Sequence, residues 1–179
     1  MILTAIDLET TGLESGFHEI CSLSAIKFDT NEWKILSEFN IKVRPAFIHR
    51  VDERALRING NTIEKLKIFT RIHIAKSKFL TWYNNLYDEK IIPVAHNWAF
   101  DKSFLEVWFG REIFQDVFSY QPYCTKSMAN YLKLKGKIPK NINSSLESLS
   151  EYFGIPHNSN NAHNDVNCCL LLLKEMLSL

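Results

Sequence analysis

The first acidic residues of the chain have a spacing that could hold a metal ion. Asp7 and Glu9 lie at the end of an apolar run, residues 2–8, whose β-forming residues predict a buried strand. Residues i and i+2 of a strand point to the same face, so the two carboxylates should lie side by side, with Ile6 and Leu8 on the other face. Such carboxylates repel each other unless a cation lies between them, and a hard divalent cation such as Mg²⁺ prefers oxygen ligands. Taken alone, the pattern is also typical of an acidic strand end exposed to water.

Two further aspartates lie where helices are predicted to begin. Asp101 follows a second strand-like run, residues 91–95, and opens a helix predicted over residues 101–109. Asp165 lies in the first turn of the last predicted helix, residues 166–177. Each aspartate alone is a typical capping residue. The combination of an acidic pair on a strand with two such aspartates points to a shared site.

The order of these motifs resembles the DEDD superfamily of 3′–5′ exonucleases. Within it, the DEDDh subgroup is the most similar, with DnaQ-like proofreading domains, RNase T and TREX-type enzymes as members. The motifs that carry the resemblance are Asp7-Leu8-Glu9-Thr10-Thr11-Gly12, then His96-Asn97-Trp98-Ala99-Phe100-Asp101, and finally Asp165. Glu19-Ile20 and the Leu146-x-x-Leu149 segment before Gly154-Ile155 also agree. The resemblance covers nearly the whole chain.

The resemblance implies a fold, a cofactor and an activity. The fold would be an α/β ribonuclease H-like fold, a central mixed β-sheet flanked by α-helices. Two Mg²⁺ or Mn²⁺ ions would be held by Asp7, Glu9, Asp101 and Asp165. Such a pair of ions would support hydrolysis of phosphodiester bonds at the 3′ ends of single-stranded DNA or RNA, with release of nucleoside 5′-monophosphates.

Residues for the substrate follow from the same motifs. Thr10, Thr11 and Leu13 would line the pocket for the 3′-terminal nucleotide, and His96 and Asn97 are expected to contact the substrate. Aromatic side chains could stack on bases or lie in the core; they are Phe17, Trp98, Trp108, Tyr120 and Tyr123.

The general base is the point where the chain departs from the family. The third family motif reads His-x-Ala-x-x-Asp, and its histidine takes a proton from the attacking water. Ala162 and Asp165 are in register, but Asn160 stands at the histidine position, and an amide cannot accept that proton at neutral pH. Three interpretations follow: the chain is weakly active or inactive, His163 is the base after a local deletion, or His157 reaches in from the Asn-rich loop. We take His163 as the candidate catalytic residue, which requires it to precede the helix, because residues two apart on a helix point about 200° apart.

Other elements must position these motifs. Residues 2–8, 19–28 and 33–43 read as three antiparallel strands, with a hairpin turn between the last two, and residues 45–61 as irregular. Helices are predicted from Thr62 onward and over residues 75–86, 126–134 and 145–153. Strands that precede helices, with one strand among the helices, predict a single α/β domain over residues 1–179.

Composition limits the classes of protein. The 179 residues carry a net charge of +1 and are 46 % hydrophobic, which excludes a disordered chain and a strongly basic nucleic-acid coat. We expect no membrane span and no signal peptide, and the four cysteines form no CxxC pair, so we expect a cytoplasmic location.

The sequence leaves alternatives open for the partners of the protein and for its class of function. The lysines of residues 133–140 form either a phosphate-contacting patch or a solvated loop. RNase T-like relatives dimerise, so the resemblance admits a homodimer. Repair or end trimming is the expected setting. The alternatives are a non-catalytic nucleic-acid-binding protein, which Asn160 favours, and a structure-selective endonuclease on the same fold.

Overall fold

A six-stranded mixed sheet forms the centre of the computed structural model, which describes residues 1–86, 89–157 and 162–179. The strand order is β4-β3-β2-β1-β5-β6. The strands are β1 (Ile2–Thr10), β2 (Ile20–Asp29), β3 (Lys34–Arg44), β4 (Thr70–Arg71), β5 (Pro93–Ala95) and β6 (Tyr123–Cys124). The first three pair antiparallel, and the remaining pairs are parallel. The predicted mixed sheet and the antiparallel hairpin are confirmed.

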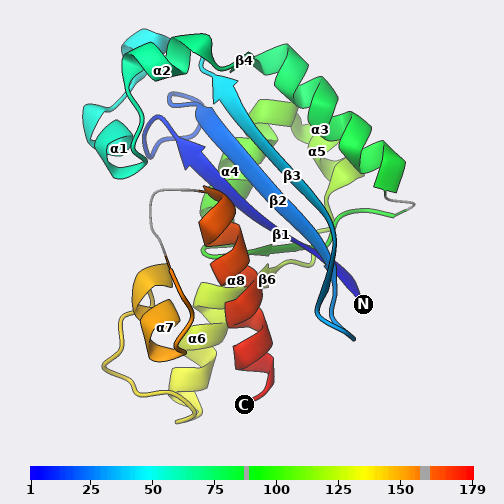
Figure 1. Ribbon diagram of the computed structural model, residues 1–179, viewed down its shortest axis with the longest axis vertical. Coiled ribbons are helices and arrows are strands. Elements are labelled where there is room, and N and C mark those ends of the chain that lie inside the picture. The colour runs from blue at the N-terminus through cyan, green and yellow to red at the C-terminus, as the bar shows by residue number, and fades with distance from the viewer. Residues whose placement is uncertain (87–88, 158–161) are drawn as a thin grey trace.

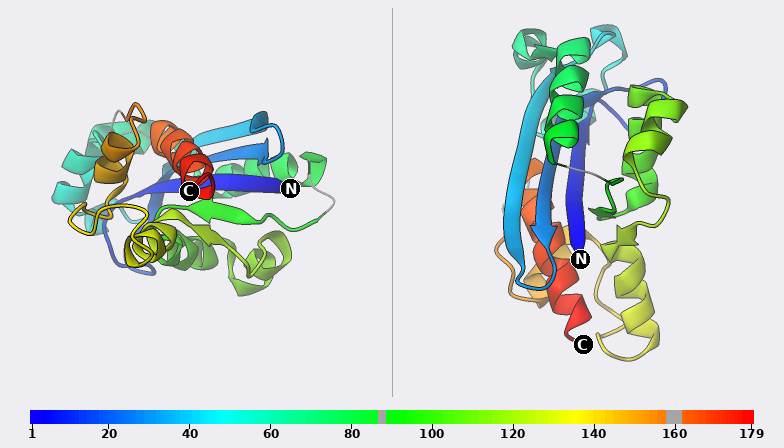
Figure 2. Two further views of the ribbon diagram at one scale, coloured as in Figure 1. Left: turned by 90° about the horizontal axis from the view of Figure 1, so that it is seen from below. Right: turned by 90° about the vertical axis from the view of Figure 1, so that its right-hand side faces the viewer.

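Helices cover both faces of this sheet (Figures 1 and 2). They are the 3-10 helix η1 (Ile48–Arg50) and α1 (Glu53–Ile58), α2 (Ile63–Ile68), α3 (Ile72–Leu86), α4 (Trp98–Phe109), α5 (Arg111–Val117), α6 (Thr125–Leu134), α7 (Leu146–Tyr152) and α8 (Ala162–Leu177). Thr62 and Ser145 cap α2 and α7 through their side-chain oxygens, as their positions predict. Helix α8 lies against one face of the sheet, and α3, α4 and α5 lie against the other.

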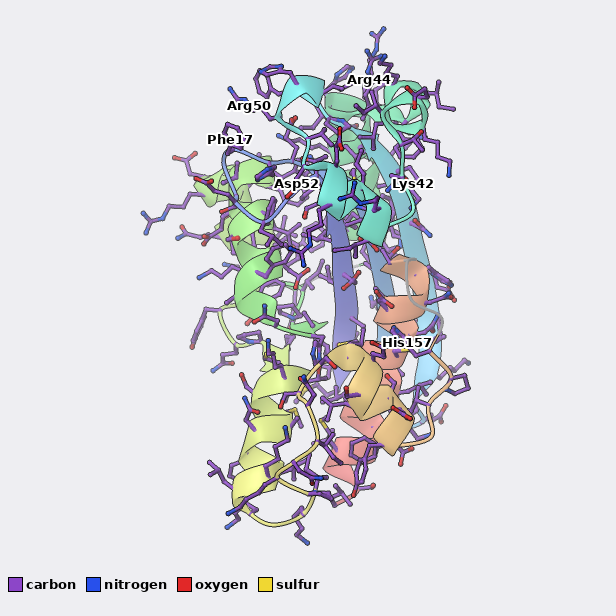
Figure 3. All side chains as sticks on the ribbon, turned by 90° about the vertical axis from the view of Figure 1, so that its left-hand side faces the viewer. Phe17, Lys42, Arg44, Arg50, Asp52 and His157 are labelled. Atoms are coloured by element: carbon purple, nitrogen blue, oxygen red, sulfur yellow. The ribbon has the colours of Figure 1, made fainter. Side chains whose placement is uncertain are left out.

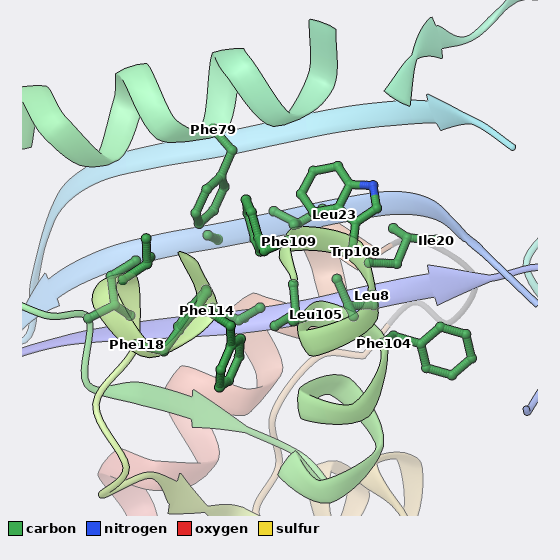
Figure 4. Close-up of a cluster of buried hydrophobic side chains, with 14 of the residues drawn as sticks. Leu8, Ile20, Leu23, Phe79, Phe104, Leu105, Trp108, Phe109, Phe114 and Phe118 are labelled. Atoms are coloured by element: carbon green, nitrogen blue, oxygen red, sulfur yellow. The ribbon is translucent and has the colours of Figure 1, made fainter. Parts of the chain in front are cut away.

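The two faces of β1 enter different cores. Ile6 and Leu8 belong to an aromatic-rich cluster with α3, α4 and α5, part of which is drawn in Figure 4. Leu3 and Ala5 pack instead with β2 and α8. The odd-numbered face therefore continues through Asp7 to Glu9 on the side of α8, as the period of two in a strand requires. Burial of both faces fixes the register of β1, since a slip of one residue would exchange the two sets.

Two expectations about the first half of the chain are wrong. Residues 45–61 are not irregular, because they contain η1 and α1. Helix α1 has six residues and buries only Leu56, which leaves no apolar period for the sequence to show. The helical pattern that starts at Thr62 is also interrupted, because β4 pairs with the end of β3 between α2 and α3.

The starts of two helices also differ from the expected positions. Helix α4 begins at Trp98, and α8 begins at Ala162. Asp101 is therefore not a capping residue, and it lies inside the first turn with its side chain buried. Helix α5 and the two-residue strand β6 were not predicted.

Substitution of one core phenylalanine tests how much the packing of helices on the sheet contributes to stability. Phe79 is fully buried and contacts the rings of Phe39, Phe109 and Phe118. We expect Phe79→Ala to lower the free energy of unfolding by about 3–5 kcal/mol, through lost burial and the cavity left behind. Urea denaturation followed by circular dichroism measures this. The control Val107→Ala, at a side chain 58 % exposed on α4, should change stability by less than about 0.5 kcal/mol. Equal losses in the two variants would contradict the assigned core.

Candidate active site

Three carboxylates meet where β1 approaches the start of α8. One oxygen from each of Asp7, Glu9 and Asp165 can be chosen so that all three lie within 4.8 Å of one another. Asp7 and Glu9 point from the α8 face of β1, and Asp165 lies in the first turn of α8. The predicted pairing of the first two carboxylates is present, and the third joins them from a segment more than 150 residues away.

Asp101 approaches the same place from α4 and is 3 % exposed. Burial raises the pKa of Asp101 well above its ordinary value, and the backbone of Leu8, the residue between the two acidic side chains of β1, partly offsets this. The negative charge of Asp101 raises the pKa of Asp7. Asp101 therefore lies close enough to the three-carboxylate cluster for its charge to act on Asp7.

The four acidic groups are held against their own repulsion. Burial raises the pKa of Asp7 well above its ordinary value, and the charges of Asp101, Asp165 and Glu9 raise it further. Burial, with help from Asp165, raises the pKa of Glu9 to about 7, although Lys42 on β3 partly offsets this. A group of carboxylates with raised pKa values gains most from a cation, because the cation stabilises the ionised forms.

The surroundings of the cluster fit a hydrated, hard divalent cation. In the register of β1 and β2, Ser24 lies directly across from Asp7, and Ser22 lies directly across from Glu9. Both serine side chains are fully buried, and neither hydroxyl has a hydrogen-bond partner among the described residues. A carboxylate cluster beside unpaired hydroxyls is a donor set of oxygens alone, which suits Mg²⁺ or Mn²⁺ and their bound waters. The hairpin register could have revealed these serines, which the sequence reading missed.

The structure separates the histidine candidates. His157 Nε2 lies 2.8 Å from Asp165 Oδ1, within hydrogen-bonding distance. His163 lies on α8 rather than in the loop before it, and its Nε2 is 3.6 Å from a carboxylate oxygen of Glu38 on β3. The condition that the sequence set for His163 is therefore not met, because His163 and Asp165 share one continuous helix. Asn160 lies outside the described residues.

The loop after β1 is shaped by the residues expected to form the nucleotide pocket. Thr10 Oγ1 donates to the carbonyl of Gly12, and Thr11 Oγ1 accepts the N–H of Glu19, so both hydroxyls brace the loop. A Cβ atom on Gly12 would lie 2.2 Å from the ring of His18, which explains the need for glycine there. Leu13, in the same loop, is 81 % exposed.

The second motif contributes structure around the site. His96 Nδ1 lies 3.0 Å from Thr125 Oγ1, and His96 Nε2 lies 3.0 Å from the carbonyl oxygen of Ser144. Burial lowers the pKa of His96 to about 4, which keeps the ring neutral. His96 therefore joins β5 to α6 and to the segment before α7. Asn97 is exposed and has a left-handed backbone conformation (φ 74°) at the start of α4.

The remaining candidates divide between surface and core. Trp98 and Trp108 are buried, Tyr123 is half-buried, and Phe17 and Tyr120 are exposed. In the lysine-rich segment of residues 133–140, Lys133 Nζ donates to the carbonyl of Ile142, which holds the segment before α7. None of the helices in the described ranges has the length and apolar character that a membrane crossing requires.

Comparison with known proteins assigns the family. Residues 4–175 match the RNase T family, described as exonucleases, and the chain belongs to this family. The DNA polymerase III PolC-type of Thermotoga petrophila is 29 % identical over 150 residues, which is 84 % of this chain and 10 % of the polymerase. The PolC-type polymerase of Oceanobacillus iheyensis is 28 % identical over 149 residues, 83 % of this chain and 9 % of the polymerase. The chain thus spans about a tenth of the length of these curated relatives.

Solved structures give the same fold. E. coli Exonuclease I in complex with a 5cy-dA13 oligonucleotide has a TM-score of 0.79 at 19 % identity, over 99 % of this chain and 40 % of that one. The nuclease domain of 3′hExo, a DEDDh family member bound to rAMP, has a TM-score of 0.72 at 17 % identity, over 99 % and 92 % of the two chains. The predicted ribonuclease H-like fold and the predicted exonuclease family are confirmed.

Acidity should control the stability of the metal-free protein. Native carboxylates with raised pKa values keep their protons to higher pH than unfolded ones do, so the native state binds more protons and its stability falls as pH rises. For Glu9 the decline should span the interval from its ordinary pKa of 4.5 to about 7. Thermal unfolding with EDTA at a series of pH values measures it.

Divalent cations should reverse that decline. Mg²⁺ or Mn²⁺ should stabilise the protein more at about pH 8 than at about pH 5, because cations and protons compete for the same oxygens. At a concentration 100 times Kd, the gain should be about 2.7 kcal/mol. A cation effect that is equal at both pH values would contradict binding at the raised-pKa carboxylates.

Proposed function

We propose that the chain is a 3′–5′ exonuclease domain that uses two Mg²⁺ or Mn²⁺ ions to hydrolyse single-stranded DNA or RNA from the 3′ end. The observation that carries the proposal is the cluster of Asp7, Glu9 and Asp165 within 4.8 Å, beside buried Asp101, on the fold of an exonuclease family. The products would be nucleoside 5′-monophosphates. Relatives of the fold include one solved with a DNA oligonucleotide and one solved with rAMP, which supports a substrate class that includes both nucleic acids.

In this proposal the site binds both the cations and the terminal nucleotide. Asp7, Glu9, Asp101 and Asp165 would hold the cations, and Ser22 and Ser24 would donate to those carboxylates or to waters around the cations. When bound, the cations would make a water nucleophilic near neutral pH and stabilise the charge on the leaving 3′-oxygen. The loop after β1 would orient the terminal nucleotide, with exposed Leu13 against the base and the backbone of the braced loop beside it.

His157 is the proton acceptor in this proposal. His157 Nε2 lies 2.8 Å from Asp165 Oδ1, so it is the ring nitrogen that faces the cluster, and in the neutral tautomer that carries its proton on Nδ1 it would accept a proton from water there. Because Asp165 belongs to the cluster, a proton from the attacking water would need to move only a short way to reach His157. His163 Nε2 lies instead 3.6 Å from a carboxylate oxygen of Glu38 on β3.

The direct test is digestion of 5′-labelled single-stranded DNA and RNA. A ladder that shortens from the 3′ end with Mg²⁺ or Mn²⁺ and disappears with EDTA is the expected result. Digestion of a covalently closed circle would indicate an endonuclease instead. Binding of metal and oligonucleotide without cleavage would indicate the non-catalytic alternative.

Neutralisation of Asp7 should separate folding from catalysis. Asp7→Asn removes a cation ligand and a repelled buried charge, so cleavage should fall by about 1,000-fold or more while the metal-free protein becomes more stable. Oligonucleotide digestion and thermal unfolding with EDTA measure the two effects. The matched control Asp116→Asn, at an exposed aspartate on α5, should change neither. Full activity in Asp7→Asn would contradict the assigned site.

Substitution of His157 and substitution of His163 should have very different effects on kcat. His157→Ala should lower kcat by about 100-fold to 10,000-fold, the usual contribution of a general base, and should change the pH profile of cleavage. His163→Ala is the matched control and should have little effect on kcat. Stabilisation of both variants by Mn²⁺ should persist, which shows that the cluster is intact. A larger loss in His163→Ala than in His157→Ala would return the role to His163.

A further inference from the structure

A second cluster of side chains lies beside the loop after β1. The guanidinium carbon of Arg50 is 4.1 Å from the ring centroid of Phe47 and 5.3 Å from that of Phe17. Phe47 and Arg50 are three residues apart around η1, and side chains with this spacing in a 3-10 helix lie on the same side. Phe17 is 46 % exposed, and Phe47 is 44 % exposed. We call these three residues the aromatic–arginine platform.

The platform is held rigidly by hydrogen bonds from the active-site loop. Both carboxylate oxygens of Glu19 accept backbone N–H groups, at 3.0 Å from Ala46 and 2.7 Å from Phe47. The N–H of Asp52 donates to the carbonyl of Thr11 at 2.8 Å. Phe17 lies in the turn closed by His18, whose backbone N–H donates to the carbonyl of Glu14. These hydrogen bonds hold the backbone that carries the two exposed rings, so this backbone loses little conformational freedom when a ligand binds.

The charge of the platform fits a polyanion. Arg50 forms no ion pair with a carboxylate in the part of the chain that the structure describes. Arg44 is exposed on the same end of the molecule, and Lys42 lies further along β3, as Figure 3 shows. Among the carboxylates on these segments, Glu19 accepts two backbone N–H groups and Asp52 caps α1, whereas Glu14 is exposed in the turn that carries Phe17. Exposed rings beside a guanidinium are a combination with which proteins bind unpaired bases.

The position of the platform relates it to the site. In Figure 3, Phe17 and Arg50 lie together beyond the end of β1, and His157 lies below them in the same view. The loop of residues 10–12 connects the two places, because it continues from Glu9 and accepts the N–H of Asp52. A strand whose 3′ end is at the carboxylates could therefore place its preceding bases on the platform.

We propose that Phe17, Phe47 and Arg50 bind unpaired bases of a single strand, upstream of its 3′-terminal nucleotide. This inference rests on the proposed function, since it assumes that the 3′ end is bound at the carboxylate cluster. The platform stacks on the face that every base offers, so it selects single strands over duplexes without reading base sequence. It also makes affinity depend on the length of the strand.

The test compares the length dependence of binding in variants of the platform. Oligothymidylates of increasing length, with phosphorothioate terminal linkages that resist cleavage, are titrated in Mg²⁺ by fluorescence anisotropy. We expect Phe17→Ala and Phe47→Ala each to weaken binding of long oligonucleotides by about 10-fold, and to leave the shortest ones unaffected. Tyr131→Ala, at an exposed ring on α6, is the control and should bind like the parent protein.

A second measurement separates this inference from the proposed function. Hydrolysis of thymidine 5′-(p-nitrophenyl phosphate) reports the carboxylate site without an upstream strand. The platform variants should keep this activity, and Asp7→Asn should lose it. If the parent protein lacks both this activity and the digestion of labelled strands, the proposed function fails while the anisotropy experiment still tests the platform. Unchanged affinity for long strands in the Phe17→Ala/Phe47→Ala double variant, or an equal loss at every length, would overturn the inference.

Discussion

The mutual repulsion of buried carboxylates is the constraint on which the rest of the structure depends. Asp7, Glu9 and Asp165 lie within 4.8 Å, and Asp101 is buried next to them. Without a cation, the repulsion among these carboxylates lowers the stability of the native state. The surrounding fold must therefore offset that repulsion through other interactions. Hydrophobic cores on both faces of β1 supply that force, since they fix the strand from which two of the carboxylates project. The same rigidity would present preformed ligands to a cation.

The loop after β1 connects the carboxylate cluster to the aromatic–arginine platform. It follows Glu9 directly, and its threonines form internal hydrogen bonds that set its shape. Glu19, at the end of this loop, orders the backbone that carries Phe47. One short segment therefore links the carboxylate cluster, exposed Leu13 and the aromatic–arginine platform. A strand bound across these parts would be held at its 3′ end by charge and upstream by stacking.

The sequence predicted the fold and the acidic residues because both leave local signals. The period of two in β1 placed Asp7 and Glu9 on one face, and the motif order indicated the exonuclease family. The histidine was harder, because its role depends on where α8 begins: the expected start at residue 166 left His163 in a loop, whereas α8 starts at Ala162. The contact of His157 with Asp165 spans eight residues and has no periodic signal.

A crystal soaked or grown with Mn²⁺ gives the most direct measurement, because anomalous scattering locates the ion independently of activity. Two anomalous peaks among Asp7, Glu9, Asp101 and Asp165 are the expected result, with Ser22 and Ser24 hydrogen-bonded to the ligands or their waters. A crystal at saturating Mn²⁺ with no peak at these carboxylates would contradict the account of the site.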